Sequence, residues 1–222
     1  MPYKEPNFDV KGAKVGLWEI TESAETIADP EVLSGHEIRK ALTFRSEPNR
    51  LLHLAGRRCL RQLAGLNDRH IIYNDNRGMP KVVPSVGYIS LAHTQGMAVA
   101  MHSTEAPVAI DVESLQRHRN LSIRKMFMNP QEEQWFTEHE DLLHFLFVWC
   151  AKECLYKLHS EVYSEISFQR ELSLKVEELT ALGEGIWRLE GGFSRDEFSA
   201  THQLEIRRVG AYIVAFNLPL GQ

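Results

Sequence analysis

The chain has 222 residues, of which 43% are hydrophobic and 25% are charged. This balance excludes an intrinsically disordered chain and allows one large domain or two small ones, each with its own core. The formal net charge of −5 argues against general binding to nucleic acid. The longest apolar run, residues 145–151, is far shorter than the roughly 20 residues of a membrane-spanning helix, and no early stretch resembles a signal peptide. We therefore expect a cytoplasmic monomer with no membrane or nucleic-acid partner.

The cysteines do not suggest a disulfide framework. Cys59 stands alone, and Cys150 and Cys154 lie one helical turn apart among apolar neighbours. Three thiols in such surroundings are typical of buried side chains in a reducing compartment. The ten histidines show no zinc-type spacing with these cysteines.

The first part of the chain predicts one strand followed by two helices. Residues 15–20 form an apolar, strand-like run, and residues 29–31 (Asp-Pro-Glu) have the residue types of a helix start. A clearer helix begins at residues 46–48 and continues through regularly spaced leucines to Leu63, with Gly65 as its end. Its polar side carries several arginines, among them Arg50.

Residues 70–113 change to β-type patterns. The turn residues 74–80 follow the first strand-like run, and residues 93–96 are interpreted as a hairpin turn between the second and third runs. The predicted strands are residues 70–73, 87–91, 97–101 and 107–112.

The second half of the chain repeats this order of elements. Asn129 followed by Pro130 predicts a helix start, and a long helix is predicted over residues 141–159. Five strand-like runs come after it: residues 166–168, 172–176, 185–189, 202–207 and 211–216. Helices followed by strands, twice, predict an α+β fold with two similar halves, 1–105 and 106–222, each with a helix pair packed on an antiparallel sheet.

Two acidic side chains lie at the end of the last strand predicted in the first series. Asp111 and Glu113 follow an apolar run and are separated by one residue. In a strand, residues i and i+2 point to the same face about 6.6–6.8 Å apart, so both can reach one ion. Oxygen ligands of this kind suit Mg²⁺. The alternative explanation is an exposed strand end, where such a pair is common.

The long helix carries an acid and a lysine on one face. Trp149, Glu153 and Lys157 are spaced by four residues. In an ordinary amphipathic helix, Glu153 and Lys157 would be an exposed ion pair worth about 0.3–0.5 kcal/mol. Here the preceding turns are apolar nearly all round, which favours the border of a partly buried cleft. There the two side chains could bind a metal ion and neutralise a phosphate.

Together these two stretches resemble the signature of the 4′-phosphopantetheinyl transferases. Residues 108–113 (Val-Ala-Ile-Asp-Val-Glu) are similar to the family's G-[IV]-D-[IV]-E pattern. Residues 149–157, about forty residues further on, are similar to W-[SCT]-x-K-E-[AS]-x-x-K. The length and the repeated layout are similar to the larger, surfactin-synthetase-activating type, which implies a pseudo-twofold tandem. The N-terminal half would then bind the coenzyme A 3′-phosphate, and the C-terminal half would carry the metal and the lysine–glutamate helix.

Upstream segments extend the resemblance. Residues 44–61 resemble the family's F-x(5)-R-x-x-x-L-x-G/A-R helix, in which Arg50 takes a position associated with the coenzyme A 3′-phosphate. Residues 88–94 resemble F-S-I-S-H-S, which makes His93 a second contact to this phosphate, and Lys40 is a further candidate. Without the resemblance, Arg50 is an exposed helix arginine and His93 a hairpin histidine. The chain departs from the family at Met79, where a lysine is usual, at Ala92 and Ala109, and at residues 159–161, where a glycine-rich turn is typical.

The resemblance implies a Mg²⁺-dependent transfer of the 4′-phosphopantetheine arm from coenzyme A to a serine of an apo acyl or peptidyl carrier protein. Asp111, Glu113 and Glu153 would hold the metal, and Glu153 would also act as general base. Lys157 would contact the phosphate beside the broken bond, and Lys152 would support the leaving phosphate. These residues and the three phosphate contacts form the predicted site.

Two alternatives stay open. One is a non-catalytic relative that only binds carrier proteins, and the other is a Mg²⁺-dependent phosphoester hydrolase that uses the same acids. Because carrier proteins of this kind are acidic, we expect a basic or apolar docking surface near residues 117–119 and 124–126. Which carrier protein is served does not follow from the sequence.

Overall fold

The computed structural model describes residues 2–219, which divide into two compact units. The first unit comprises residues 2–108 and the second residues 109–219. Each combines helices with an antiparallel sheet, so the α+β prediction is confirmed. The pseudo-twofold relation between the halves stays a prediction.

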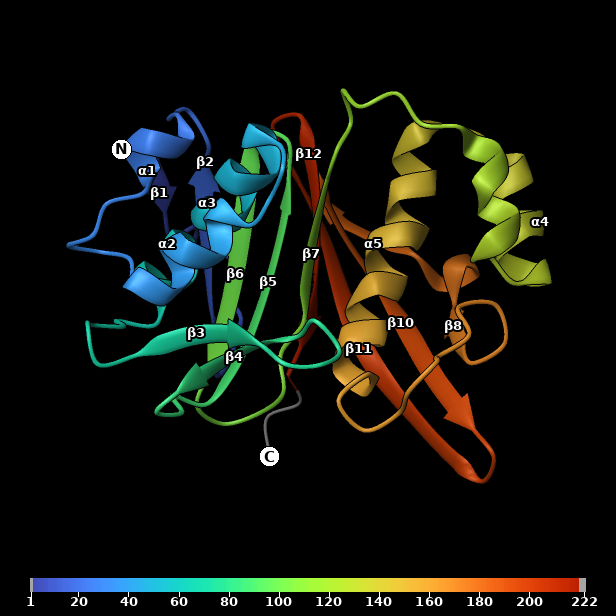
Figure 1. Cartoon of the computed structure of the whole chain (residues 1–222). Coiled ribbons are helices and arrows are strands. Elements are labelled where there is room, and N and C mark those ends of the chain that lie inside the picture. The colour runs from blue at the N-terminus through green and yellow to red at the C-terminus, as the bar shows by residue number, and fades with distance from the viewer. Residues whose placement is uncertain (1, 220–222) are drawn as a thin grey trace. The chain divides into compact units, whose positions relative to one another are not determined.

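The first unit has a four-stranded sheet and a separate hairpin (Figure 1). The strand order of the sheet is β1-β2-β6-β5, and β3 pairs with β4. The elements in chain order are β1 (Tyr3–Lys4), β2 (Lys14–Glu19), α1 (Ala24–Ile27), α2 (Gly35–Leu42), α3 (Glu47–Leu63), β3 (Ile71–Asn74), β4 (Pro80–Val83), β5 (Tyr88–Thr94) and β6 (Met97–Ser103).

Helix α3 begins where the sequence predicts and organises the core of this unit. The hydroxyl of Ser46 accepts the backbone N–H of Asn49, and Pro48 occupies the first turn, where no intrahelical partner is lost. Its buried face, which includes Ala55, Cys59 and Leu60, packs on β2, β5 and β6. The opposite face is left for α2 and the β3–β4 hairpin.

The predicted helix start at residues 29–31 is wrong. These residues form a turn, and α2 begins at Gly35 behind a capping box in which Ser34 and Glu37 satisfy each other's backbone N–H groups. The Glu37 carboxylate also accepts two bonds from Arg61 of α3, at 2.9 and 3.1 Å. A contact over 24 residues therefore helps to decide where this helix begins.

The hairpin between β5 and β6 is tighter than predicted. Its turn is Gln95–Gly96, where Gly96 has a positive φ of 85°, the region that favours glycine. His93, expected in the turn, instead belongs to β5 and lies opposite Ala98 of β6. Strand β4, which follows the turn residues 74–80, was not predicted.

The second unit has a larger antiparallel sheet. Its strand order is β7-β12-β11-β10-β8, and β9 pairs separately with β10. Residues 166–168, predicted as a strand, instead form an irregular segment. The elements are β7 (Ile110–Ser114), η1 (Leu121–Met126), α4 (Pro130–Glu138), α5 (Leu142–His159), β8 (Leu172–Leu174), η2 (Val176–Glu178), β9 (Thr180–Gly183), β10 (Ile186–Arg195), β11 (Phe198–Val209) and β12 (Tyr212–Leu218).

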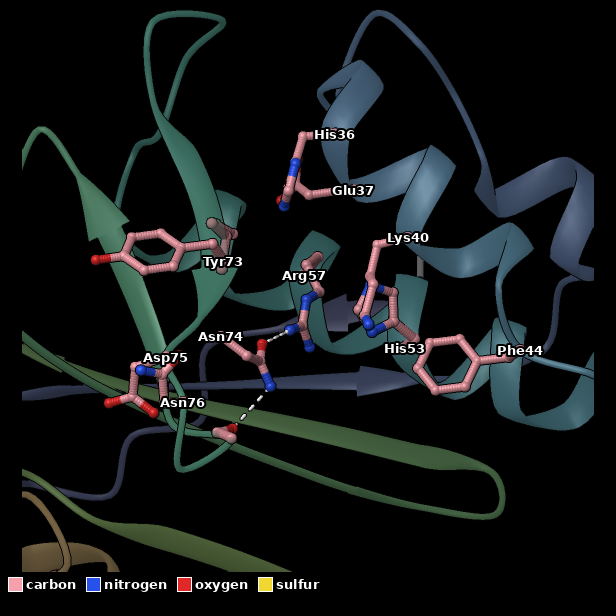
Figure 2. Close-up of a pocket in the computed structure, with 12 residues that line it drawn as sticks. His36, Glu37, Lys40, Phe44, His53, Arg57, Tyr73, Asn74, Asp75 and Asn76 are labelled. Carbon is pink, nitrogen blue, oxygen red and sulfur yellow. Dashed lines mark hydrogen bonds between the residues drawn. The ribbon is translucent and has the colours of Figure 1, made fainter.

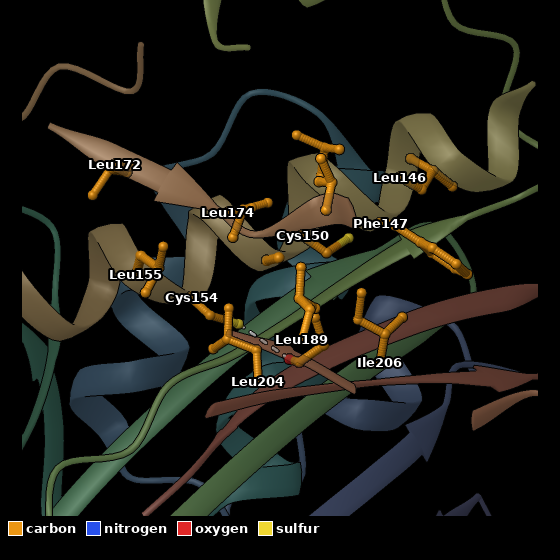
Figure 3. Packing of buried hydrophobic residues seen from close by; sticks show 14 of the residues in the cluster. Leu146, Phe147, Cys150, Cys154, Leu155, Leu172, Leu174, Leu189, Leu204 and Ile206 are labelled. Carbon is orange, nitrogen blue, oxygen red and sulfur yellow. Dashed lines mark hydrogen bonds between the residues drawn. The ribbon is translucent and has the colours of Figure 1, made fainter. Parts of the chain in front are cut away.

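Helix α5 is the centre of the second core (Figure 3). It packs against β7, β8, β10, β11 and β12, which explains why its sequence is apolar on most sides. The thiols of Cys150 and Cys154 are fully buried in this core, and Cys154 donates to the Ala215 carbonyl at 3.2 Å. Cys59 is buried too, so all three cysteines are free thiols, as expected.

Gly191 of β10 allows the close approach of this helix. A Cβ at this position would lie 2.9–3.1 Å from leucine side chains of α5, β8 and β11. Despite the apolar surface of α5, no helix within residues 2–219 combines the length and apolar content that a bilayer crossing requires.

Candidate active site

Strand β7 and helix α5 bring the two acid-bearing stretches together. Asp111 lies opposite Ala215 in the sheet and is 8% exposed. The Lys157 ammonium, near the end of α5, donates to Asp111 Oδ1 at 2.8 Å and to the Ile110 carbonyl at 2.7 Å. Lys157 therefore fixes the end of the helix to the acidic strand.

The two side-chain oxygens of Asp111 differ in their surroundings. Oδ2 is buried and accepts no hydrogen bond from the described residues. Burial raises the pKa of Asp111, and the Lys157 ammonium opposes this rise. Burial alone would lower the pKa of Lys157, but Asp111 and Glu153 outweigh it, so the pKa of Lys157 is raised. Lys157 is thus held as a cation, and a buried oxygen next to it is left to be satisfied.

Glu113 is paired with an arginine that follows the strand. Its carboxylate forms an ion pair with Arg119, and both side chains are mostly buried. Arg119 is therefore part of this site, whereas the sequence analysis places it near the expected docking surface.

Glu153 lies one turn before Lys157 on α5. Burial raises its pKa to about 7, the charge of Asp111 adds to this rise, and Lys157 opposes it. Within residues 2–219 no hydrogen bond to its carboxylate is recorded. A half-buried carboxylate without a donor and with a pKa near neutrality is well suited to accept a proton.

Asp111, Glu113 and Glu153 have the carboxylate oxygens that suit a divalent cation, although their side chains are not arranged as a complete set of metal ligands. In the part of the chain that the structure describes, no three His, Cys, Asp or Glu side chains lie close enough to hold one metal ion. The charges of Asp111 and Glu113 nevertheless raise the pKa of Glu153, and Glu113 also raises the pKa of Asp111. Asp111 Oδ2 is a buried acceptor without a donor among the described residues. Carboxylate oxygens are the ligands that Mg²⁺ takes in proteins. To use all three acids, Glu113 would have to leave Arg119.

Lys152 does not join this group. Its side chain is fully buried and its ammonium bonds to Glu132 of α4 at 2.5 Å and to the carbonyls of Phe127 and Phe168 at 2.8 and 2.7 Å. All three donors of the ammonium are thereby used within the protein. This placement supports a structural role, and nothing in it supports the catalytic role predicted for Lys152.

The phosphate contacts predicted in the first unit lie on α2, α3 and β5. The Arg50 guanidinium donates through Nε to the Phe44 carbonyl at 2.9 Å, and no bond of its other nitrogens is recorded among residues 2–219. The Lys40 ammonium is 6.0 Å from the Phe44 ring centre. The exposed His93 lies beside Gly56 of α3, whose missing Cβ would be 3.5 Å from the His93 ring.

A cavity of about 620 Å³ opens next to these residues, between α2, α3 and the β3–β4 hairpin (Figure 2). Lys40 and Phe44 line it, together with His53 and Arg57, to which the sequence interpretation had given no role. His53 and Arg57 follow Arg50 by three and seven residues, which places these three side chains on one face of α3. That periodicity was the available signal, but arginine-rich helix faces are usually exposed.

The match to known protein families covers the unit that holds the acids. Residues 107–216, about half of the chain, match the family model described as the 4′-phosphopantetheinyl transferase superfamily. A comparison of the sequence with curated proteins finds no match. The matched range includes Asp111, Glu113, Glu153 and Lys157, the residues that carry the resemblance in the sequence. Through residues 107–216, the chain belongs to the 4′-phosphopantetheinyl transferase superfamily.

Proposed function

We propose that the protein transfers the 4′-phosphopantetheine arm of coenzyme A to a serine of an apo acyl or peptidyl carrier protein, with Mg²⁺ as cofactor. The observation that carries this proposal is the contact of Lys157 with Asp111, because it joins the two halves of the signature in space. An acid with a raised pKa, Glu153, lies one helical turn away.

The reaction needs a proton acceptor. The serine hydroxyl attacks the phosphorus that carries the pantetheine arm, the pyrophosphate bond breaks, and adenosine 3′,5′-bisphosphate leaves. Glu153 would accept the serine proton, since no donor within residues 2–219 holds its carboxylate. Lys157 would stabilise the phosphate beside the broken bond, because its ammonium is fixed by Asp111 and remains charged.

The acids would hold the metal. Mg²⁺ bound by Asp111, Glu113 and Glu153 would neutralise the pyrophosphate and the charge on the leaving group. The ion pair of Glu113 with Arg119 gives the chain its own means of neutralising this acid when no cation is bound. Arg119 is therefore expected to influence metal affinity.

The first unit would anchor the nucleotide end of coenzyme A. Arg50, His93 and Lys40 would bind the 3′-phosphate, which coenzyme A has and dephospho-coenzyme A lacks. Arg50 is prepared for this role, because its Nε bond to the Phe44 carbonyl orients the guanidinium.

The carrier protein would dock beside η1, where an apolar and a basic side chain are free. Met126 is 77% exposed, and no ion pair of the adjacent Lys125 is recorded in the described chain. Arg124 is a weaker candidate than the sequence suggested, because its guanidinium lies 3.6–3.7 Å from two glutamates and over the Phe136 ring. Reversing the charge of Lys125 should slow carrier modification, and Lys175, an exposed lysine of the same unit that is paired with glutamates, gives a matched control.

Mass spectrometry of an apo carrier protein incubated with coenzyme A and Mg²⁺ tests the function. A gain of the phosphopantetheine mass is expected, and Glu153→Gln should reduce its rate by about 10²–10⁴-fold, as loss of a general base does. Replacement of the exposed Glu177 by glutamine should leave the rate unchanged.

Other outcomes would contradict the proposal. No mass gain with several carrier proteins tried would exclude the transfer. Release of free phosphopantetheine without carrier modification would indicate a hydrolase, and coenzyme A binding without turnover would indicate a non-catalytic relative.

A further inference from the structure

Two histidines meet where helix α4 ends and helix α5 begins (Figure 1). His139 is the residue that follows α4, and His144 lies in the first turn of α5. Their ring centres are 5.2 Å apart. Glu153 follows His144 by nine residues on the same helix, which is about 13.5 Å along its axis. The pair is therefore separate from the acidic site, and the proposed reaction uses neither histidine.

The hydrogen bonds of the two rings determine which nitrogen is left for a ligand. Nδ1 of His139 bonds to the Trp135 carbonyl at 2.8 Å, and Nδ1 of His144 bonds to Asp141 Oδ1 at 2.9 Å. A carbonyl oxygen and an ionised carboxylate can only accept, so each neutral ring carries its proton on Nδ1. Nε2 then has a lone pair, and no bond of either Nε2 is recorded among residues 2–219.

This arrangement is typical of histidines that bind a metal ion. In metal sites the second ring nitrogen of a ligand histidine usually donates to a carbonyl or a carboxylate, which fixes its tautomer and raises its basicity. Two rings that bind one tetrahedral Zn²⁺ through Nε2 at about 2.0–2.1 Å have centres about 5 Å apart. The separation of 5.2 Å between His139 and His144 therefore already suits a shared ion.

Trp135 of α4 supports both rings. Its indole is stacked on the His139 ring, with 4.6 Å between the centres, and lies at 73° to the His144 ring, with 5.4 Å between the centres. Phe147 contacts the His144 ring from the next turn of α5, at 5.5 Å. Side chains that packing and hydrogen bonds already hold lose little conformational freedom when an ion binds.

The charges at this corner attract a cation, and the ligand type selects which one. The segment that joins the helices is Glu-His-Glu-Asp, residues 138–141, and its three acids are exposed. Imidazole nitrogens suit Zn²⁺, Cu²⁺ and Ni²⁺, whereas Mg²⁺ takes oxygen ligands. Because no three His, Cys, Asp or Glu side chains within residues 2–219 lie close enough to hold one ion, water would complete the coordination. We therefore expect micromolar affinity.

We propose that His139 and His144 form a second metal site, which binds Zn²⁺ or a transition-metal ion of the same preference, and that Asp141 positions His144 in it. The metal would join the end of α4 to the start of α5. Glu132 and Lys152 already form one contact between these helices, and the metal would add another at their junction. The proposal does not depend on the proposed function, because it concerns other residues and another ion.

Isothermal titration calorimetry with Zn²⁺ tests the site on the full chain without a polyhistidine tag. Excess Mg²⁺ is present to compete for the carboxylates. One Zn²⁺ per chain should bind, and a concentration one hundred times the dissociation constant should raise the melting temperature by about 5–10 °C. His139→Gln and His144→Gln should each weaken binding at least about tenfold, since losing a ligand costs no less than losing its supporting group.

A second probe reports on the ligands directly. The electron paramagnetic resonance spectrum of one equivalent of Cu²⁺ should show hyperfine splitting from two imidazole nitrogens, and from one in each histidine variant. His118→Gln is the control, because His118 is an exposed histidine of the same unit outside this corner. It should bind Zn²⁺ and Cu²⁺ as the unaltered protein does.

Asp141→Asn separates the metal site from the helix cap. Asparagine keeps an oxygen that can accept the backbone N–H of His144, so α5 stays capped, but the charge that supports the ring is lost. Zn²⁺ should bind about 10–100-fold more weakly, with little change in the melting temperature of the metal-free protein. Unchanged affinity would overturn the positioning role of Asp141.

The melting temperature of each metal-free variant verifies that it is folded. Folded His139 and His144 variants that bind Zn²⁺ as tightly as the unaltered protein would overturn the proposed site. So would an unaltered protein that binds no Zn²⁺, or a Cu²⁺ spectrum without two imidazole nitrogens.

Discussion

Substitutions in the buried ion pair between Lys152 and Glu132 can show whether Lys152 stabilises the fold or takes part in catalysis. Replacing Lys152 by alanine removes three donors and leaves the Glu132 carboxylate in a fully buried position. Only the backbone N–H groups of Asn129 and Leu174, at 2.8 and 2.9 Å, would still donate to it. The variant therefore has to protonate this acid or expose it to water.

The expected cost follows from that geometry. Breaking a buried pair by removing one partner typically destabilises a protein by about 3–5 kcal/mol. The carbonyls of Phe127 and Phe168 lose their donors as well, which places Lys152→Ala at the upper end. In a chain of this size each kcal/mol shifts the melting temperature by about 2–4 °C, so a fall of about 10 °C or more is expected.

Thermal and urea unfolding measure this loss. The double variant Lys152→Met, Glu132→Leu should recover part of it, because it buries no unpaired charge. Carrier modification should be assayed at a temperature at which each variant is folded. There the double variant should keep most of the transfer rate, since neither side chain lies with Asp111.

The opposite pattern would refute the reasoning. If Lys152→Ala is as stable as the unaltered protein to within about 1 kcal/mol but has lost transfer activity, Lys152 acts on the substrate and the buried ion pair is not structural.

Further predictions concern packing and protonation. Gly191→Ala should destabilise the protein by about 1–3 kcal/mol, because three leucine side chains lie within 3.1 Å of the added methyl group, whereas Gly183→Ala meets no atom within 4 Å. His159, whose pKa burial lowers to about 4, bonds to His202 at 2.9 Å, so the unfolding free energy should fall as the pH decreases from 6.5 to 4. Unfolding with His202→Gln should show a smaller pH dependence. Arg61→Ala should cost about 3–5 kcal/mol in urea unfolding, since it leaves a buried carboxylate unpaired.

Local signals predicted the long helices and most strands. Helices α3 and α4 begin where the sequence predicts, because Ser46 and Asn129 cap them and a cap is formed by residues within one helical turn. The start of α2 was misplaced because Asp29-Pro30-Glu31 has the same local residue types. What favours Ser34 instead includes the contact of Glu37 with Arg61, which no local pattern contains.

The same difference explains the candidate site. The shared strand face of Asp111 and Glu113 and the shared helix face of Glu153 and Lys157 could be predicted, because the periodicity of strands and helices determines side-chain directions. The burial of Lys152 could not be predicted, since it depends on a contact with Glu132, which belongs to another helix and lies twenty residues earlier. The position of His53 in a cavity wall could not be predicted either, because the β3–β4 hairpin supplies the other side of that cavity.

The strand order of the second unit has a consequence for protein synthesis. Strand β7, which carries Asp111 and Glu113, is at the end of the sheet and pairs with β12, the last strand of the described chain. About a hundred residues separate these neighbours, so the acidic strand emerges from the ribosome long before its partner exists. An interrupted translation product that stops before Tyr212 would have α5 and all the proposed catalytic acids. It would still lack the strand that holds Asp111 in register, so premature chains should be inactive and open to proteolysis.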